Sequence, residues 1–146
     1  MEKPYEILEH MADGKFRAYG RTLEEAFTNA ALAMASLMWD WEKIKLERKK
    51  KVKVEASTLE QLIVRFLSEV IYLLEVRSFL LGRVETISIE EIKLNDKKLY
   101  RLEAEVTGDD VSPEYEIYGQ VKAVTYNDLK IEKTDDGLVV QIVVDM

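Results

Sequence analysis

The aspartate Asp145 has the clearest potential for chemistry in this sequence. It directly follows residues 138–144, an apolar run interrupted only by Gln141. A carboxylate at the end of a buried strand is partly desolvated unless a counter-charge neutralises it. One interpretation is a solvated strand end. The other is an oxygen ligand for a hard cation such as Ca²⁺, completed by a second carboxylate and by backbone oxygens.

The natural second carboxylate is Asp13, which we expect in a tight loop beside Gly14. An ordinary turn-forming role also explains an aspartate in such a loop. His10, the single histidine of the chain, stands three residues earlier. It could be a metal ligand, a base or a packed strand residue, and with no second histidine and no nucleophile at triad spacing we favour a structural role. An outer-shell role at a metal site is the alternative for His10.

Two basic features stand out in a chain whose net charge is −7. Lys122 lies in the strand-like segment VKAVTY, where a lone lysine is usually a surface residue that extends its ammonium to water. A basic run surrounds a second strand-like segment, and its members are Arg48, Lys49, Lys50, Lys51 and Lys53. We interpret this run as a solvated sheet edge that discourages strand pairing, with a docking patch for an acidic partner as the alternative.

Composition narrows the class of protein. A chain of 146 residues, 47% hydrophobic, is expected to fold as one domain over residues 1–146. The absence of cysteine excludes disulfides and thiolate metal sites. The longest apolar run is far short of the roughly 20 residues of a membrane span, and no export signal is evident, so we expect a cytoplasmic protein with no membrane partner.

The content of charged residues bears on two questions, whether the protein binds nucleic acids directly and what kind of organism it comes from. Acidic residues outnumber basic ones by 28 to 21, which disfavours direct binding of RNA through its phosphates. Glycine-rich phosphate loops and RNA-binding aromatic pairs are also missing. Charged residues make up 34% of the chain and side-chain amides are few, a balance typical of heat-adapted proteins. We therefore expect a thermophilic source.

Two amphipathic helices are predicted in the first half of the chain. Thr22 and Glu25 form a capping box, and apolar residues then recur at helical spacing to Met38. Thr58 and Gln61 mark a second start, followed by an apolar stripe that ends near residue 74. Both helices therefore have a broad apolar face to bury.

The remaining segments have the two-residue period of strands. The first 20 residues predict a hairpin, and residues 100–106 alternate between apolar and charged side chains. Asn95-Asp96 predicts the turn before that strand, and Asp135-Asp136-Gly137 predicts a hairpin into residues 138–144, which we expect to form a central strand. The fold class is therefore α+β, a single domain with two amphipathic helices packed on a mainly antiparallel sheet.

Three blocks together resemble the archease family: HMADGKFRAYGRTLEEAFTNAALAM, VKAVTY and the final Val-Val-Asp-Met. The similarity runs over essentially the whole chain, in order, and the combination is specific although no single block is. It implies a metal-binding accessory protein of the RNA-splicing ligase RtcB, which joins tRNA exon halves. Such a protein promotes guanylylation of the ligase by GTP, gives it multiple turnover and broadens its use of nucleotides.

The resemblance also implies roles for individual residues. Asp13 and Asp145 match the metal-binding carboxylates of the family, and Met146 matches a position that adds a main-chain oxygen to the same ion. Lys122 matches a lysine that matters for ligase activation. The implied cofactor is Ca²⁺ or another hard divalent cation.

The chain departs from the family pattern at four positions. Met11 replaces a small hydroxyl residue, Gly14 an aliphatic one and Arg65 a frequent acidic one. Asn127 stands where a histidine commonly follows the VTY block, so a histidine that helped activation in relatives would have no counterpart here.

The resemblance implies a non-catalytic activator that meets tRNA only indirectly, through the ligase. Two alternatives remain. A general chaperone or modulator of DNA- and RNA-processing proteins would need an exposed apolar or methionine-rich surface, for which Met34 and Met38 are a weak hint. An enzyme would recruit His10, Asp13 and Asp145 for metal-assisted hydrolysis, but no nucleophile or general acid is evident.

Overall fold

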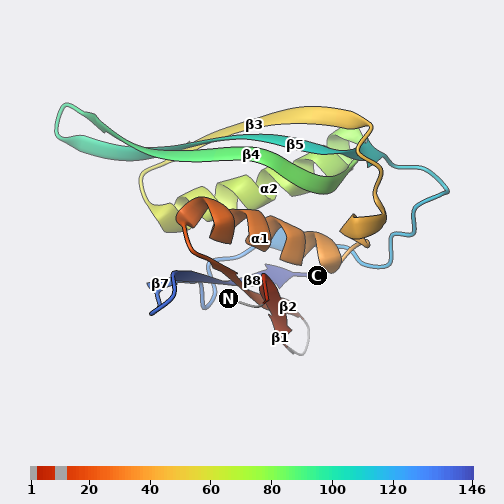
Figure 1. Ribbon diagram of the computed structural model, residues 1–146, viewed down its shortest axis with the longest axis horizontal. Helices are drawn as coiled ribbons and strands as arrows, with labels where there is room; N and C mark the ends of the chain where they lie inside the picture. Colours follow the sequence, from red (N-terminus) through yellow and green to blue (C-terminus); the bar gives the residue numbers. More distant parts are fainter. Residues whose placement is uncertain (1–2, 9–12) are drawn as a thin grey trace.

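The computed structural model describes residues 3–8 and 13–146. Its elements in chain order are β1 (Tyr5–Leu8), β2 (Asp13–Gly20), α1 (Leu23–Ser36), the short 3₁₀ helix η1 (Trp41–Lys43), β3 (Arg48–Ala56), α2 (Leu59–Arg77), β4 (Phe79–Leu94), β5 (Lys97–Asp110), β6 (Ala123–Val124), β7 (Lys130–Lys133) and β8 (Leu138–Asp145). Figure 1 shows three layers, with both helices between a sheet of β3, β4 and β5 and a second sheet that contains β1, β2, β7 and β8.

Both predicted helix starts are confirmed, because the capping residues make the expected hydrogen bonds. Thr22 accepts a hydrogen bond from the backbone N–H of Glu25 at 3.1 Å, and Thr58 accepts one from the backbone N–H of Gln61 at 3.1 Å. Each bond satisfies one of the donors that the first helical turn leaves without a partner. At the other end of α2, Ser78 adopts a left-handed conformation with φ of 53°, which ends the helix and turns the chain into β4.

The α+β class and the antiparallel pairing are confirmed, but the strands divide into two sheets where the sequence predicted one. The three-stranded sheet has the order β3-β5-β4. The five-stranded sheet has the order β1-β2-β8-β6, and β7 also pairs with β8. Every pair among the described strands is antiparallel. Local periodicity identifies a strand but does not say which sheet it joins. The division into two sheets depends on tertiary packing, in which the helices cover one face of each sheet.

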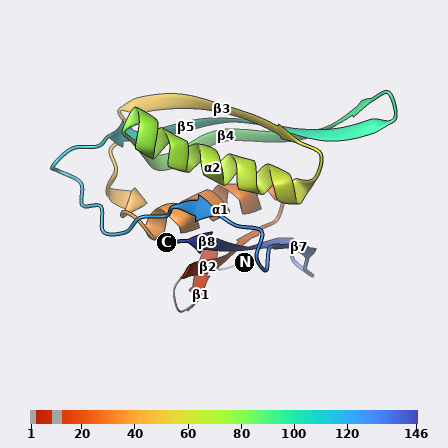
Figure 2. The same ribbon diagram turned by 180° about the vertical axis from the view of Figure 1, so that it is seen from behind.

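The core lies between the sheets, around the two helices. Phe27 of α1 and Phe66 of α2 stack with ring centroids 6.4 Å apart, and both are fully buried. Trp39, also fully buried, follows α1 and donates its indole N–H to the carbonyl oxygen of Leu81 at 2.9 Å, which ties the end of that helix to β4. Seen from behind, α2 lies across the three-stranded sheet with β6 and β8 below it (Figure 2).

The predicted central strand and its hairpin are confirmed. β8 pairs with β2 on one side and with β6 and β7 on the other. Gln141, the one polar residue within its apolar run, is only 5% exposed. Its amide is nevertheless satisfied, because it accepts from Arg17 Nε at 3.0 Å and donates to the carbonyl oxygen of Asp128 at 2.8 Å.

The Asn95-Asp96 turn is also confirmed, and it closes a hairpin of β4 and β5 that projects beyond the helices (Figure 1). Both turn residues have positive φ, 48° and 70°, the conformation that two-residue hairpin turns require. No helix in the described part of the chain is long and apolar enough to cross a membrane.

The basic run lies on β3, which is an edge strand as predicted. Three of its cations form ion pairs with carboxylates on or beside β5, at distances from 3.1 to 3.9 Å: Arg48 with Asp110, Lys49 with Glu105 and Lys53 with Glu103. These pairs neutralise much of the positive charge of the run. The edge-strand interpretation therefore explains the run without a partner.

Candidate functional site

The structure brings the two candidate carboxylates together at one end of the five-stranded sheet. Asp13, the first residue of β2, lies directly opposite Asp145, the last residue of β8. Directly opposed residues of antiparallel strands have Cβ atoms about 4.5–5.5 Å apart on the same face. The next pair, Gly14 and Val144, is buried on the helix side, so alternation places both carboxylates on the outward face.

The expected turn position of Asp13 is wrong, because the structure places this residue in β2, where it forms the last pair of the ladder with β8. The pairing of β2 with β8 continues from Gly20 without a break to Asp13. Asp-Gly is a strong local turn signal, but eight consecutive pairs with a central strand outweigh it. His10 and Met11 lie outside the described residues.

Lys122 lies beside the same end of β8. Its backbone N–H donates to the carbonyl oxygen of Asp145 at 2.7 Å, and the following residue, Ala123, pairs with Asp145 in the sheet. The sequence predicts a strand over VKAVTY, but the strand in the structure is much shorter. β6 contains only two residues and begins after Lys122. The lysine side chain is exposed, as expected. Asp145 is therefore flanked by Asp13 on one side and by the Lys122 segment on the other.

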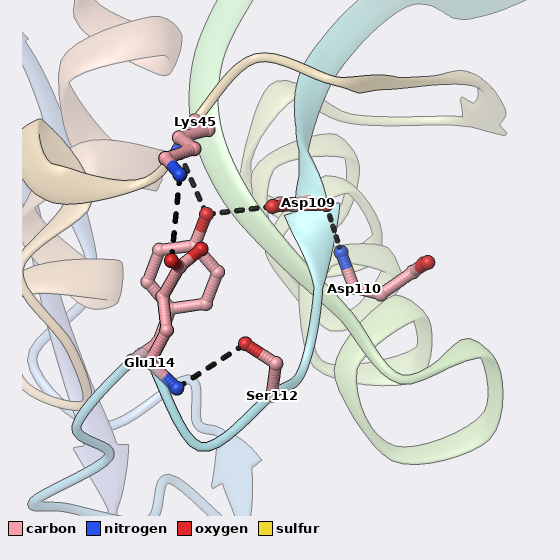
Figure 3. Close-up of polar contacts among 6 residues, drawn as sticks. Lys45, Asp109, Asp110, Ser112 and Glu114 are labelled. Atoms are coloured by element: carbon pink, nitrogen blue, oxygen red, sulfur yellow. Dashed lines mark hydrogen bonds and ion pairs between the residues drawn. The ribbon is translucent and has the colours of Figure 1, made fainter.

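The loop that carries Lys122 to this position starts with a polar cluster (Figure 3). Tyr115 donates its hydroxyl to Asp109 at 2.6 Å and accepts the backbone N–H of Lys45 at 3.2 Å. Lys45 also pairs with Glu114 at 3.4 Å, and the backbone N–H of Glu114 donates to Ser112. Burial, with a smaller contribution from the bond to Asp109, raises the pKa of Tyr115 to about 12. That same bond lowers the pKa of Asp109. The cluster fixes the loop at its first turn.

The second half of the loop is fixed to the end of α1. Tyr118 donates its backbone N–H to the carbonyl oxygen of Met38 at 2.9 Å and its hydroxyl to that of Ser36 at 2.8 Å. Ser36 is the last residue of α1, where carbonyl oxygens lack intrahelical partners, and Met38 lies two residues beyond it. Val121 is 1% exposed within the core. The position of Lys122 therefore follows from packing on both sides of it.

Sequence reasoning missed a polar group on the outward face next to the carboxylates. Lys15 lies two residues beyond Asp13 on that face and pairs with Asp128 at 3.8 Å, while its side chain is only 21% exposed. Asp128 has a positive φ of 52°, and its carbonyl oxygen accepts from the buried amide of Gln141. The two-residue period of β2 could have placed Lys15 on this face. The contribution of Asp128 depends on a loop that only the fold brings over the sheet.

The donor set fits a hard cation. Two aspartate carboxylates and main-chain oxygen, such as that of Met146, are oxygen ligands of the kind that Ca²⁺ takes. The described residues contain no group of three or more histidine, cysteine, aspartate or glutamate side chains arranged to hold a metal. Because Ca²⁺ takes 6–8 oxygens, oxygen groups beyond these three residues, including water, would complete the site.

Sequence comparison matches nearly the whole chain to one family of known proteins. The model of the family described as "Archease protein family (MTH1598/TM1083)" matches residues 5–146. The chain is 43% identical over 145 residues to protein archease of Methanosarcina mazei, covering 99% of this chain and 97% of the relative. It is 38% identical over 136 residues to protein archease of Thermococcus kodakarensis, covering 92% of each chain.

A solved structure shares the fold. The solution structure of Methanobacterium thermoautotrophicum protein 1598 superposes with a TM-score of 0.79 at 24% sequence identity, covering 98% of this chain and 99% of that one. The family model and the curated relatives each span nearly the whole chain. This chain therefore belongs to the archease family.

Proposed function

We propose that this protein activates the RNA-splicing ligase RtcB in tRNA splicing, by promoting guanylylation of the ligase, multiple turnover and broader nucleotide use. Membership of the archease family supports an accessory role in RNA processing. In this proposal the protein has no catalytic activity of its own, works in the cytoplasm, and meets tRNA only through the ligase.

The pairing of Asp13 with Asp145 across β2 and β8 carries the proposal. Two carboxylates on directly opposed residues repel each other, and a divalent cation between them removes that repulsion. Asp13, Asp145 and the main-chain oxygen of Met146 would hold Ca²⁺ or a similar ion. His10 would be an outer-shell partner.

The protein's own residues would present this end of the sheet to the ligase. The bound cation would supply a fixed positive charge that organises anionic groups. Lys122 adds an ammonium, and its backbone is already fixed to Asp145 at 2.7 Å. The rigid placement of Lys122 and the two carboxylates would favour the productive arrangement of nucleotide and ligase without further ordering cost.

The chaperone alternative loses its one sequence hint. Met34 and Met38 are both 0% exposed, so they form no adaptable methionine-rich surface.

Multiple-turnover ligation by a cognate RtcB, measured with and without this protein, tests the proposal. We expect the wild-type protein to stimulate ligation. We expect the Asp13→Asn, Asp145→Asn and Lys122→Ala variants to lose this stimulation. None of these three residues is buried, so the variants should still fold. Matched controls on β7 are Glu132→Gln and Lys130→Ala, which remove one charge each from exposed positions of the same sheet. Full stimulation by either Asp variant would contradict the proposal.

A second measurement separates activation from catalysis. The purified protein is incubated with phosphoesters and nucleotides, with and without Ca²⁺ or Mn²⁺. We expect no turnover. Metal-dependent hydrolysis that Asp145→Asn abolishes would favour the enzyme interpretation instead.

A further inference from the structure

We infer that the side chain of Met146 is a positioning residue, which packs into a slot between Gly14 and Gly119 and so holds the end of β8 in place beside Asp13. This inference rests on the proposed function, because the groups that it positions are the Asp145 carboxylate and the main-chain oxygen of Met146.

The first wall of the slot is Gly14, whose missing side chain leaves space that Met146 shares with Leu37 and Val144. A Cβ atom added to Gly14 would lie 3.0 Å from Met146 Sδ and 2.9 Å from both Leu37 Cδ1 and Val144 Cγ2. Contacts that close are tighter than van der Waals packing accepts, so the thioether, Leu37 and Val144 together occupy the volume over this glycine.

The opposite wall is Gly119, in the loop that leads to Lys122. A Cβ atom there would lie 2.1 Å from the carbonyl oxygen of Leu37 and 3.6 Å from Met146 Cε. The first distance means that the loop backbone approaches the end of α1 more closely than any side chain permits. The second places the methyl group of Met146 at the same junction. Met146 therefore lies over the backbone of β2 at Gly14 and close to the Lys122 loop at Gly119.

Strand alternation explains why this packing positions the carboxylates and does not compete with them. Val144 faces the helices and is fully buried, Asp145 faces outward, and Met146 turns back toward the helices, where it packs against the core. A residue at the end of a strand frays unless contacts hold it. The anchor on the inner side thus restrains the peptide that carries the oxygen ligands on the outer side.

Three segments of the chain, β2, β8 and the loop before Lys122, approach one another at Met146. Met146 lies over Gly14, the residue after Asp13, and near Gly119, three residues before Lys122, and it directly follows Asp145. Its thioether is flexible enough to fill an irregular gap between two backbones. Shortening the side chain would loosen the spacing among all three groups.

The test compares Met146→Ala with Met146→Leu, using Ca²⁺ alone as the probe in calorimetric titration. We expect Met146→Ala to bind Ca²⁺ about tenfold more weakly, as removal of a group that orients metal ligands typically does. Met146→Leu, which refills the slot, should restore affinity to within about threefold, because a Leu-for-Met exchange nearly conserves volume. Val76→Ala, at a position 58% exposed on α2, is the matched control and should change nothing.

Amide hydrogen exchange without added metal provides the readout that does not depend on Ca²⁺. We expect Met146→Ala to speed exchange of the Asp145 and Lys122 amides by about tenfold while amides in α2 keep their protection. If the wild-type protein binds no Ca²⁺, the proposed metal site is wrong, and the exchange result still decides the positioning role. Unchanged exchange at both amides in Met146→Ala would overturn the inference. Uniformly faster exchange across the domain would also overturn it, since that indicates general destabilisation.

Discussion

Replacing Asp145 with asparagine should change stability in opposite directions with and without Ca²⁺. Asp145 and Asp13 lie directly opposite each other on the outward face of the sheet. Two unit charges about 5 Å apart interact with about 0.8 kcal/mol in a water-like dielectric and more in a less solvated one. Asp145 is exposed, so the water-like value applies to its interaction with Asp13. We therefore expect Asp145→Asn to stabilise the metal-free protein by about 1 kcal/mol.

Calcium reverses the order of stability. A ligand that binds only the folded state at about 100 times its Kd adds about 2.7 kcal/mol to the free energy of unfolding. The wild-type protein should gain that amount, whereas Asp145→Asn, which has lost one carboxylate, should gain almost none. The variant is then more stable in chelator and less stable in Ca²⁺.

Urea unfolding in chelator and in excess Ca²⁺ measures both differences. Glu132→Gln removes one negative charge from an exposed position of β7 and controls for the overall change in net charge. It should leave the Ca²⁺ gain intact. Equal Ca²⁺ stabilisation of Asp145→Asn and wild type would refute the metal site, and destabilisation of the variant in chelator would refute the repulsion between the two carboxylates.

Three further predictions concern the framework. Gly108→Ala should lower the free energy of unfolding by about 2 kcal/mol, because its Cβ would lie 1.9 Å from the carbonyl oxygen of Leu80, and denaturant unfolding measures this. Thr58→Ala should cost about 1 kcal/mol in the same assay, since it removes the cap of α2. Burial and the bond to Asp109 raise the pKa of Tyr115 to about 12, so the folded state keeps this proton where an unfolded tyrosine, with a pKa of about 10, loses it. The contribution of Tyr115 to the free energy of unfolding should therefore be fully present below the unfolded-state pKa and be lost as pH rises through the folded-state pKa. The alkaline loss of stability should be smaller in Tyr115→Phe.

Matched variants make these three results decisive. Gly137→Ala changes a turn glycine with negative φ and should be nearly neutral. Thr86→Ala removes a hydroxyl from an exposed strand position and should cost less than the loss of the cap. Tyr126→Phe alters a tyrosine that is 57% exposed and should leave the alkaline decline unchanged. A control variant that changed stability as much as its test variant would contradict the role assigned to that feature. The three features are the crowding at Gly108, the cap of α2 and the Tyr115 cluster.

Sequence pattern predicted the local features because their causes are local. The capping threonines are followed three residues later by the residue whose backbone they bind, and the turn at Asn95-Asp96 needs only two residues that accept positive φ. The same short-range logic failed for Asp13. Its turn propensity is real, but the partner that decides its conformation lies at the other end of the chain.

By itself the sequence determined the two amphipathic helices, the central apolar strand and the residue types able to hold a hard cation, since each depends on neighbours a few positions away. Only the tertiary structure decided that the strands form two sheets, that Asp13 meets Asp145 in register, and that Met146 packs over Gly14. Such contacts join segments far apart in the chain, and their geometry is set by how α1 and α2 pack between the sheets. A one-residue slip of β8 against β2 would turn one carboxylate toward the helices, so the site exists only because the buried faces of those strands fix their register.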